Sequence, residues 1–192
     1  MLEKTVSNLV IRMVLDSTEE IIGTNGLKAM LNYAKLISLY ENKPDYSLEK
    51  NYTDEEYGHL TASWYKVLGT SGGKAVFRMI GKSSGKRSIG TGIFESLKDL
   101  PVNDKLFKMI ELFALATGRG KALREGDVII YDNPQCSACS NFTSDTSVCT
   151  ALNGAFDEYA VWAGVAGMKT VETECKAKGH KTCRYEIRPA TA

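Results

Sequence analysis

Five cysteines are the residues whose type and spacing point most directly to chemistry. The chain has 192 residues, and all of its cysteines lie in the last third. An odd number of clustered thiols in a reducing compartment favours metal binding or thiol chemistry over a disulfide framework. We therefore expect the functional chemistry in the C-terminal third, among Cys136, Cys139, Cys149, Cys175 and Cys183.

Two of these cysteines lie in a predicted β-hairpin. Residues 169–175 and 182–188 alternate in polarity around a turn at Gly179, a pattern typical of two antiparallel strands. A regular ladder would place Cys175 opposite Cys183 on one face of the hairpin. Neighbouring thiolates suit Zn²⁺, which takes four protein ligands in a structural site. The sequence therefore predicts two further ligands from elsewhere in the chain.

Strand geometry constrains one of the candidates for these further ligands. Glu172 and Cys175 are three residues apart, which puts them on opposite faces of an ideal strand. A Glu172 ligand therefore predicts a bulge or bend near Glu174. The residues alone also leave open a site built from thiolates only. The candidates are Glu172, Cys149 at the head of a predicted helix, His180 in the hairpin turn, and the pair Cys136 and Cys139.

Three runs near the C-terminus carry a resemblance to a known family. They are residues 149–156 (CTALNGAF), 163–167 (AGVAG) and 171–183 (VETECKAKGHKTC). Together they resemble the C-terminal half of the 4-vinyl-reductase domain family. That family includes bacteriochlorophyll-biosynthesis proteins and the sensor domains of aromatic-responsive transcription activators, and it is similar in fold to tethering-complex subunits of the transport particle. The resemblance implies a structural zinc ion held by Cys149, Glu172, Cys175 and Cys183.

The same resemblance implies a function. It predicts non-catalytic binding or sensing of a small hydrophobic or aromatic molecule, with a tetrapyrrole as one candidate, in an apolar pocket braced by the zinc. It also implies a homodimer and a separate output protein. The alternative is a reductase or accessory factor that acts on the vinyl group of a chlorophyll precursor. The sequence has no nicotinamide or flavin fingerprint, so the hydride source for such a reaction would be external.

Aromatic side chains at helical spacing are candidates for the pocket lining, although the same spacing also predicts an ordinary core. The two histidines, His59 and His180, lie on a predicted helix and in the hairpin turn, and neither suggests acid–base catalysis. The candidate pocket residues are Trp64, Phe107, Phe113, Phe156 and Trp162.

The sequence pattern predicts that helices come first along the chain and that most strands lie near its C-terminus. We expect an α+β fold in one domain, 1–192, with N-terminal helices packed on a small antiparallel sheet and a C-terminal zinc-braced β-hairpin. We find no internal repeat in the sequence. The pattern predicts helices at 6–22, 27–39, 53–68, 75–81, 101–117 and 150–164, a strand at 127–132, and loops at 40–52 and 81–92.

Composition excludes several classes of protein. Hydrophobic residues make up 43% of the chain, charged residues 24%, and the formal net charge is +1. These values are typical of folded globular proteins and give no field that would attract nucleic acid. No apolar run approaches the roughly 20 residues that span a bilayer. The first residues do not form a secretory signal, so we expect a cytoplasmic protein without a membrane span.

Overall fold

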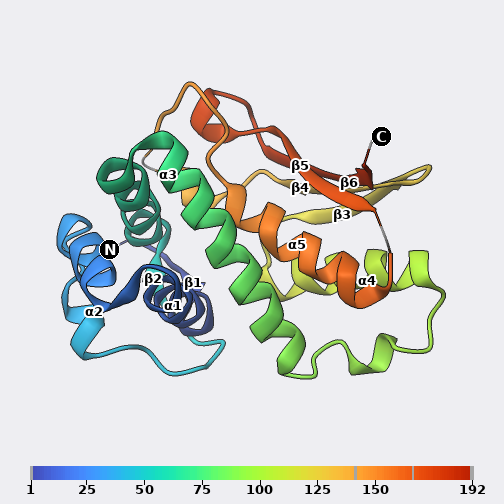
Figure 1. Cartoon of the computed structure of the whole chain (residues 1–192), viewed down its shortest axis with the longest axis horizontal. Coiled ribbons are helices and arrows are strands. Elements are labelled where there is room, and N and C mark those ends of the chain that lie inside the picture. The colour runs from blue at the N-terminus through green and yellow to red at the C-terminus, as the bar shows by residue number, and fades with distance from the viewer. Residues whose placement is uncertain (1, 141, 166, 191–192) are drawn as a thin grey trace.

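The computed structural model describes residues 2–140, 142–165 and 167–190 and has two antiparallel sheets among its helices (Figure 1). The smaller sheet pairs β1 with β2, and the larger has the strand order β3-β4-β6-β5. The helices are α1 (Asn8–Tyr33), α2 (Ser38–Glu41), α3 (Asp54–Gly90), α4 (Val102–Thr117) and α5 (Thr150–Ala163). The strands are β1 (Lys4–Ser7), β2 (Lys50–Thr53), β3 (Lys121–Glu125), β4 (Val128–Asn133), β5 (Met168–Glu174) and β6 (Cys183–Pro189).

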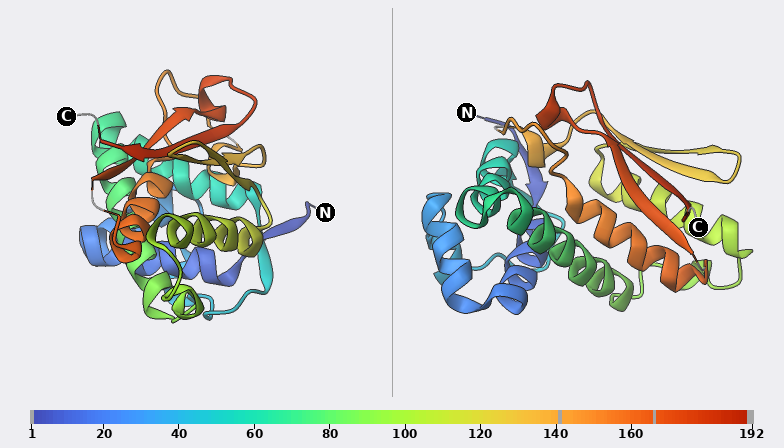
Figure 2. Two further views of the ribbon diagram at one scale, coloured as in Figure 1. Left: turned by 90° about the vertical axis from the view of Figure 1, so that its right-hand side faces the viewer. Right: turned by 45° about the horizontal axis from the view of Figure 1, so that its top comes forward.

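The α+β class is confirmed, but the helices that cover the large sheet are not the ones expected. The two late helices, α4 and α5, pack on it, while α3 lies against the other side of α5 (Figure 2). The first helix packs against α3 instead. The expectation that the N-terminal helices pack on the large sheet is therefore wrong, because α4 and α5 already cover its apolar face. One continuous apolar core still runs from Val6 to Ile187.

The first 90 residues contain an internal repeat that the sequence analysis missed. A strand leads into a long helix twice, and both helices are kinked at a glycine, Gly23 (φ 73°, ψ 171°) and Gly69 (φ 71°, ψ 170°). Only glycine adopts this backbone conformation without strain. The kinks open two similar runs, residues 23–29 (GTNGLKA) and 69–75 (GTSGGKA). Equivalent residues are 46 positions apart, as in Lys4 and Lys50, Ser7 and Thr53, and Gly23 and Gly69.

The two units pair as the halves of a symmetric dimer would. In the antiparallel ladder Lys4 lies opposite Thr53, and Ser7 lies opposite Lys50. Val6 lies opposite its own equivalent, Tyr52. This reciprocal pattern is that of a two-fold axis, here within one chain. The repeat was missed in the sequence because β1 and β2 are only four residues long and are separated along the chain by α1 and α2.

Residues 81–90 form helix rather than the expected loop. Glycine-rich sequence suggested a break, yet α3 runs to Gly90. The glycines allow α3 to approach α5 closely: a Cβ atom on Gly81 would lie 1.8 Å from the backbone oxygen of Ala151. A Cβ on Gly154 of α5 would lie 2.1 Å from the backbone oxygen of Arg78. These glycines therefore serve helix packing.

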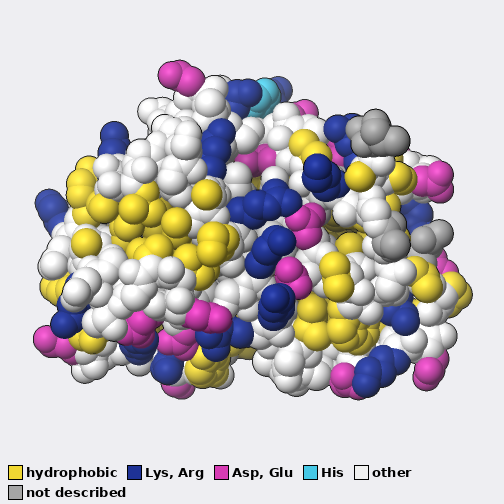
Figure 3. All heavy atoms as spheres, viewed as in Figure 1, with side chains coloured by type: hydrophobic (Ala, Val, Ile, Leu, Met, Phe, Trp, Pro, Cys, Tyr) yellow, Lys and Arg dark blue, Asp and Glu magenta, His cyan; other side chains and the backbone are white. Residues whose placement is uncertain are grey.

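The predicted start of a helix at residue 53, the end of another at 117 and the C-terminal hairpin are confirmed. Thr53 caps α3 through a capping box with Glu56, α4 ends at Gly118 in the left-handed conformation, and β5 and β6 form an antiparallel hairpin. On the face seen in Figure 3, basic and acidic side chains are interspersed, as the small net charge suggests. Across the described residues, no helix combines the length and apolarity that crossing a lipid bilayer requires.

Candidate functional site

The five cysteines come together in one buried cluster. Their thiols come from the 3₁₀ turn 137–139 and the residue before it, from the residue before α5, from the residue after β5 and from the first residue of β6. Cys139 is central, with its Sγ atom 3.0 Å from that of Cys149 and 3.7 Å from that of Cys183. All five side chains are buried and none forms a disulfide. Residues far apart in sequence thus build a sulfur-rich site that water cannot readily enter.

Two sets of four side chains in this cluster could each hold a metal ion, with ligand atoms all within 4.8 Å of one another. The first set is the one that the sequence analysis predicted, and the structure brings its four members together. The second is made of thiols only. Their members are Cys149, Glu172, Cys175 and Cys183 in the first set, and Cys136, Cys139, Cys149 and Cys183 in the second.

Glu172 reaches the cluster because β5 is irregular. The register of β5 against β6 shifts between Glu172 and Glu174, which is the irregularity expected for a Glu172 ligand. Glu172 Oε2 accepts a hydrogen bond of 3.1 Å from the backbone N–H of Cys149. Its Oε1 is buried and has no hydrogen-bond partner among the described residues. A buried carboxylate oxygen without a partner costs free energy, so a cation at this position would satisfy it.

Burial and close contacts shift the pKa values of the side chains in the cluster. Burial, with the neighbouring Cys175, raises the pKa of Glu172 to about 10. Hydrogen bonds from Cys139 and Cys149 lower the pKa of Cys175 to about 6. The thiol of Cys136 contributes most to lowering the pKa of Cys183 to about 6. Hydrogen bonding with Cys136 instead raises the pKa of both Cys139 and Cys149. Two of the thiols therefore ionise readily, and Cys139 and Cys149 lose their protons only when a metal binds them, because thiolates are the form that binds metal.

The backbone around Cys149 is fixed by two buried tyrosines. The hydroxyl of Tyr65 donates to the carbonyl oxygen of Val148, and that of Tyr185 donates to the carbonyl oxygen of Cys149 at 3.2 Å. His180 lies in the hairpin turn, where its Nδ1 accepts a 3.3 Å hydrogen bond from the backbone N–H of Cys175. It thus shapes the turn and is not in either four-ligand set.

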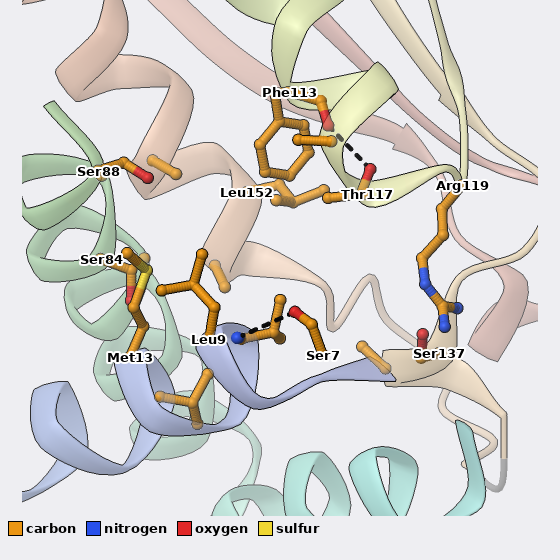
Figure 4. A pocket seen from close by; sticks show the side chains of 18 of the residues that line it. Ser7, Leu9, Met13, Ser84, Ser88, Phe113, Thr117, Arg119, Ser137 and Leu152 are labelled. Atoms are coloured by element: carbon orange, nitrogen blue, oxygen red, sulfur yellow. Dashed lines mark hydrogen bonds between the residues drawn. The ribbon is translucent and has the colours of Figure 1, made fainter. Parts of the chain in front are cut away.

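A cavity of about 290 Å³ lies beside the cluster. Its lining comes from β1, α1, α3, α4, α5 and the large sheet, and Figure 4 shows Leu9, Met13, Phe113 and Leu152 around it. Cys136 and Cys149 belong both to this lining and to the thiol cluster. The cavity and the candidate metal site therefore share a wall.

Several charged and polar groups in the lining form hydrogen bonds to other groups of the protein. Arg119 donates to Asp54 at 2.6 Å and to the carbonyl oxygen of Gln135 at 3.0 Å. Thr117 donates back to the carbonyl oxygen of Phe113 at 2.9 Å. Ser84 lies 3.3 Å from the hydroxyl of Ser17. An occupant of the cavity would thus meet mainly apolar surface.

Of the five aromatic residues predicted to line a pocket, Phe113 lines this cavity. The other four lie elsewhere. Trp64 stacks on Phe77 in the core, and Phe156 packs between Tyr131 and Tyr185. Phe107 lies beneath the guanidinium of Arg124, and Trp162 lies beside Phe94 and the ammonium of Lys105.

The sequence analysis missed the lining residues of α1 and α3. Their signal is the spacing of small residues along α3: Gly81 and Gly85, and Ser84 and Ser88, are pairs one helical turn apart. All four line the cavity. A helix face without large side chains leaves room both for α5 and for the cavity.

Comparisons with known proteins identify the fold. The sequence matches no protein-family model and no curated protein. Among solved structures, a doubly substituted H-NOX protein designated Tt is similar, with a TM-score of 0.63 and 14% identity over 97% of this chain and 98% of that one. A substituted H-NOX protein from S. oneidensis in the Fe(II) ligation state has a TM-score of 0.61 and 12% identity over 97% of each chain.

A further H-NOX structure from S. oneidensis, in the Fe(II)NO ligation state, has a TM-score of 0.57 and 12% identity over 94% of this chain and 99% of that one. Likeness over nearly the whole chain shows a common fold. The resemblance to the 4-vinyl-reductase family is therefore wrong: the chain folds like H-NOX proteins. The three runs that suggested the resemblance lie in and between α5 and the β5–β6 hairpin. Short motifs of this kind do not identify one family.

Proposed function

We propose that this protein binds a small apolar molecule in the cavity between α1, α3, α4 and α5, without catalysing a reaction on it. The observation that carries the proposal is the cavity of about 290 Å³, whose lining is mainly apolar and whose Arg119 is hydrogen-bonded within the protein. Ligand pockets are typically concave and mainly apolar, with volumes from about 300 Å³ upwards. This cavity is near the lower end, which favours a compact ligand over a tetrapyrrole.

The Fe(II) named for two of the H-NOX neighbours raises the question of an iron porphyrin. Protein haem iron is bound by histidine, or by a cysteine thiolate, methionine or tyrosine. Both histidines of the chain, His59 and His180, are exposed, and neither lines the cavity. The two lining cysteines face other thiols in the cluster. A histidine-ligated haem therefore does not fit this chain.

A structural zinc ion held by Cys149, Glu172, Cys175 and Cys183 is the second part of the proposal. Four protein ligands would close the coordination sphere and leave no position for a reactive water. The ion would tie the hairpin to the first turn of α5 and so fix one wall of the cavity. The expected homodimer and separate output protein stay predictions.

Binding can be tested with benzene, because dry apolar cavities take up such molecules. Methyl NMR of the protein during a benzene titration should show shifts for Leu9, Met13 and Leu152. The variant Leu152→Trp should fill the cavity and weaken binding at least tenfold. The matched control is Leu115→Trp, since Leu115 is on α4 but 79% exposed and outside the lining.

Two outcomes would contradict the proposal. One is benzene binding that is equally tight in the Leu152→Trp variant and in a second filling variant, Leu9→Trp. The other is stoichiometric uptake of haemin whose absorption spectrum changes in a His59→Ala/His180→Ala variant, since that would establish histidine ligation.

A further inference from the structure

Two thiols of the cluster have no role in the proposed zinc site. Cys136 and Cys139 are buried, yet they are outside the set that contains Glu172. Their Sγ atoms lie 3.9 Å apart, and that of Cys136 lies 3.4 Å from the Sγ of Cys149. A buried pair of thiols directed at other thiols calls for a separate explanation.

The two four-ligand sets overlap in a specific way: both contain Cys149 and Cys183. Each set also has two members of its own, which are Cys136 and Cys139 on one side and Glu172 and Cys175 on the other. Six side chains can thus give two ions four ligands each, provided that two thiolates are shared. A thiolate has lone pairs enough to bridge two metal ions.

Two of the distances between sulfur atoms match those of ligands that share one ion. In a tetrahedral site with Zn–S bonds of roughly 2.3 Å, two sulfur ligands of one ion lie about 3.8 Å apart. The shared pair, Cys149 and Cys183, has an Sγ–Sγ distance of 3.9 Å. Cys139 lies 3.7 Å from Cys183. Within the set of the second ion, the Cys139–Cys149 distance of 3.0 Å and the Cys136–Cys149 distance of 3.4 Å would have to lengthen on metal binding. The 3.8 Å between Cys139 and Cys175, which would bind different ions, would also have to lengthen.

We propose that the cluster holds two zinc ions that share the thiolates of Cys149 and Cys183. One ion would also bind Glu172 and Cys175, as in the proposed function on which this inference rests. The second would bind Cys136 and Cys139 and lie next to the cavity wall. On binding, each thiol gives up its proton to solvent as its sulfur forms a bond to the metal.

The surroundings stabilise the bridging thiolates. The backbone N–H of Lys176 donates to the Sγ of Cys183 at 3.3 Å. Cys149 is the N-cap of α5, where the partial positive charge of the helix N-terminus favours an anion. Five thiolates and one carboxylate carry six negative charges, so two divalent ions neutralise more of this buried charge than one ion can.

The donor set selects zinc over other thiolate-binding metals. In a four-iron cluster each cysteine binds a different iron, so inorganic sulfides separate the cysteine ligands, whereas these sulfurs are in direct contact at 3.0–3.9 Å. Copper(I) prefers soft ligands only, and the carboxylate of Glu172 is a hard one. Zinc accepts both thiolate and carboxylate oxygen.

Metal stoichiometry tests the inference. Native mass spectrometry of the full chain with zinc should show two ions per chain in the parent protein and one in the Cys136→Ser/Cys139→Ser variant. The control is Ser137→Ala in the same turn, which should keep two. Circular dichroism verifies that each variant is folded.

Cobalt(II) provides a readout that does not depend on the variants. The first equivalent should give an electron paramagnetic resonance signal, and the second should reduce it, because two ions sharing thiolates couple magnetically. Any of three results would overturn the two-ion site. These are a parent protein that binds one ion, a double variant that still binds two ions, and a second equivalent of cobalt that adds to the signal. One ion per chain would leave the proposed function intact, and the benzene titration tests the cavity separately.

Discussion

Two regions of the molecule achieve order by different means. Residues 4–90 are two related strand–helix units, joined by a symmetric strand pair and by apolar packing of α1 on α3. The second region, residues 121–190, contains the large sheet and α5, and a group of buried thiols and one carboxyl group lies between them. The first region is held mainly by apolar packing and the strand pair. The second has a buried cluster of five thiols and Glu172, whose Oε1 has no hydrogen-bond partner among the described residues, and in the proposed function a metal ion completes it.

The largest expected effect comes from metal removal. Structural zinc contributes roughly 10 kcal/mol or more in small zinc modules, so chelation at neutral pH should lower the melting temperature by more than about 10 °C and weaken benzene binding. Hydrogen exchange should increase first in β5, β6 and the first turn of α5, while α1 and α3 stay protected. Uniform loss of protection, or unchanged melting, would contradict the contrast between the regions.

Disrupting the contact between the regions should have the next largest effect. Gly81→Ala brings a Cβ atom against the backbone of Ala151 in α5, which forces the helices apart. We expect destabilisation by about 3 kcal/mol, measured by urea unfolding. Gly90→Ala is the matched control because nothing lies within 4 Å of its Cβ position, and it should be neutral or slightly stabilising. Equal effects of the two changes would refute close packing at Gly81.

The equivalence of the two N-terminal units can be tested at their kinks. Gly23→Ala and Gly69→Ala each place a side chain at φ near +70°, with nothing within 4 Å of either Cβ position. The cost is therefore backbone strain alone, about 1–3 kcal/mol for each. Chemical denaturation should give similar values for the two variants, and a large inequality would argue against equivalent roles.

The smallest expected effect is a pH dependence at the point where the regions meet. Burial of Asp54 opposes its ionisation, but hydrogen bonds from Arg119 and Thr5 outweigh it and lower the pKa of Asp54 below its usual 3.8. The stabilisation is thus present above pH 3.8 and is lost as the pH falls through the lower folded-state pKa. Between pH 5 and 2, the melting temperature of the parent should fall more steeply than that of Asp54→Asn. Parallel curves would mean that the pair contributes nothing.

The sequence predicted features that depend on neighbours in the chain. The cap at Thr53, the end of α4 at Gly118, the β5–β6 hairpin and the bulge near Glu174 all follow from local stereochemistry. Zinc chemistry made Cys149 and Glu172 candidates among several, and only the family resemblance selected them, since strand parity required a bulge for Glu172 to take part.

What could not be predicted depends on contacts between distant segments. The pairing of β1 with β2 joins residues about 46 apart, and the glycines of α3 were interpreted as breaks because their partner, α5, lies some 70 residues later. Burial of Trp64 and Phe156 follows from helical periodicity, but periodicity cannot distinguish core from cavity wall. The family resemblance failed because a few cysteines define a local motif and not the topology around it.

The internal two-fold axis has a consequence for how the halves of such a fold can diverge. In a dimer of identical subunits every substitution occurs in both subunits, so neither subunit can adapt its surface independently. Here the positions equivalent to Gly81 and Gly85 of α3 are Lys35 and Leu39, which lie beyond the end of α1. Within one chain the two copies can differ in sequence. Helix α3 continues beyond the equivalent point and carries glycines that pack against α5, whereas α1 ends before it.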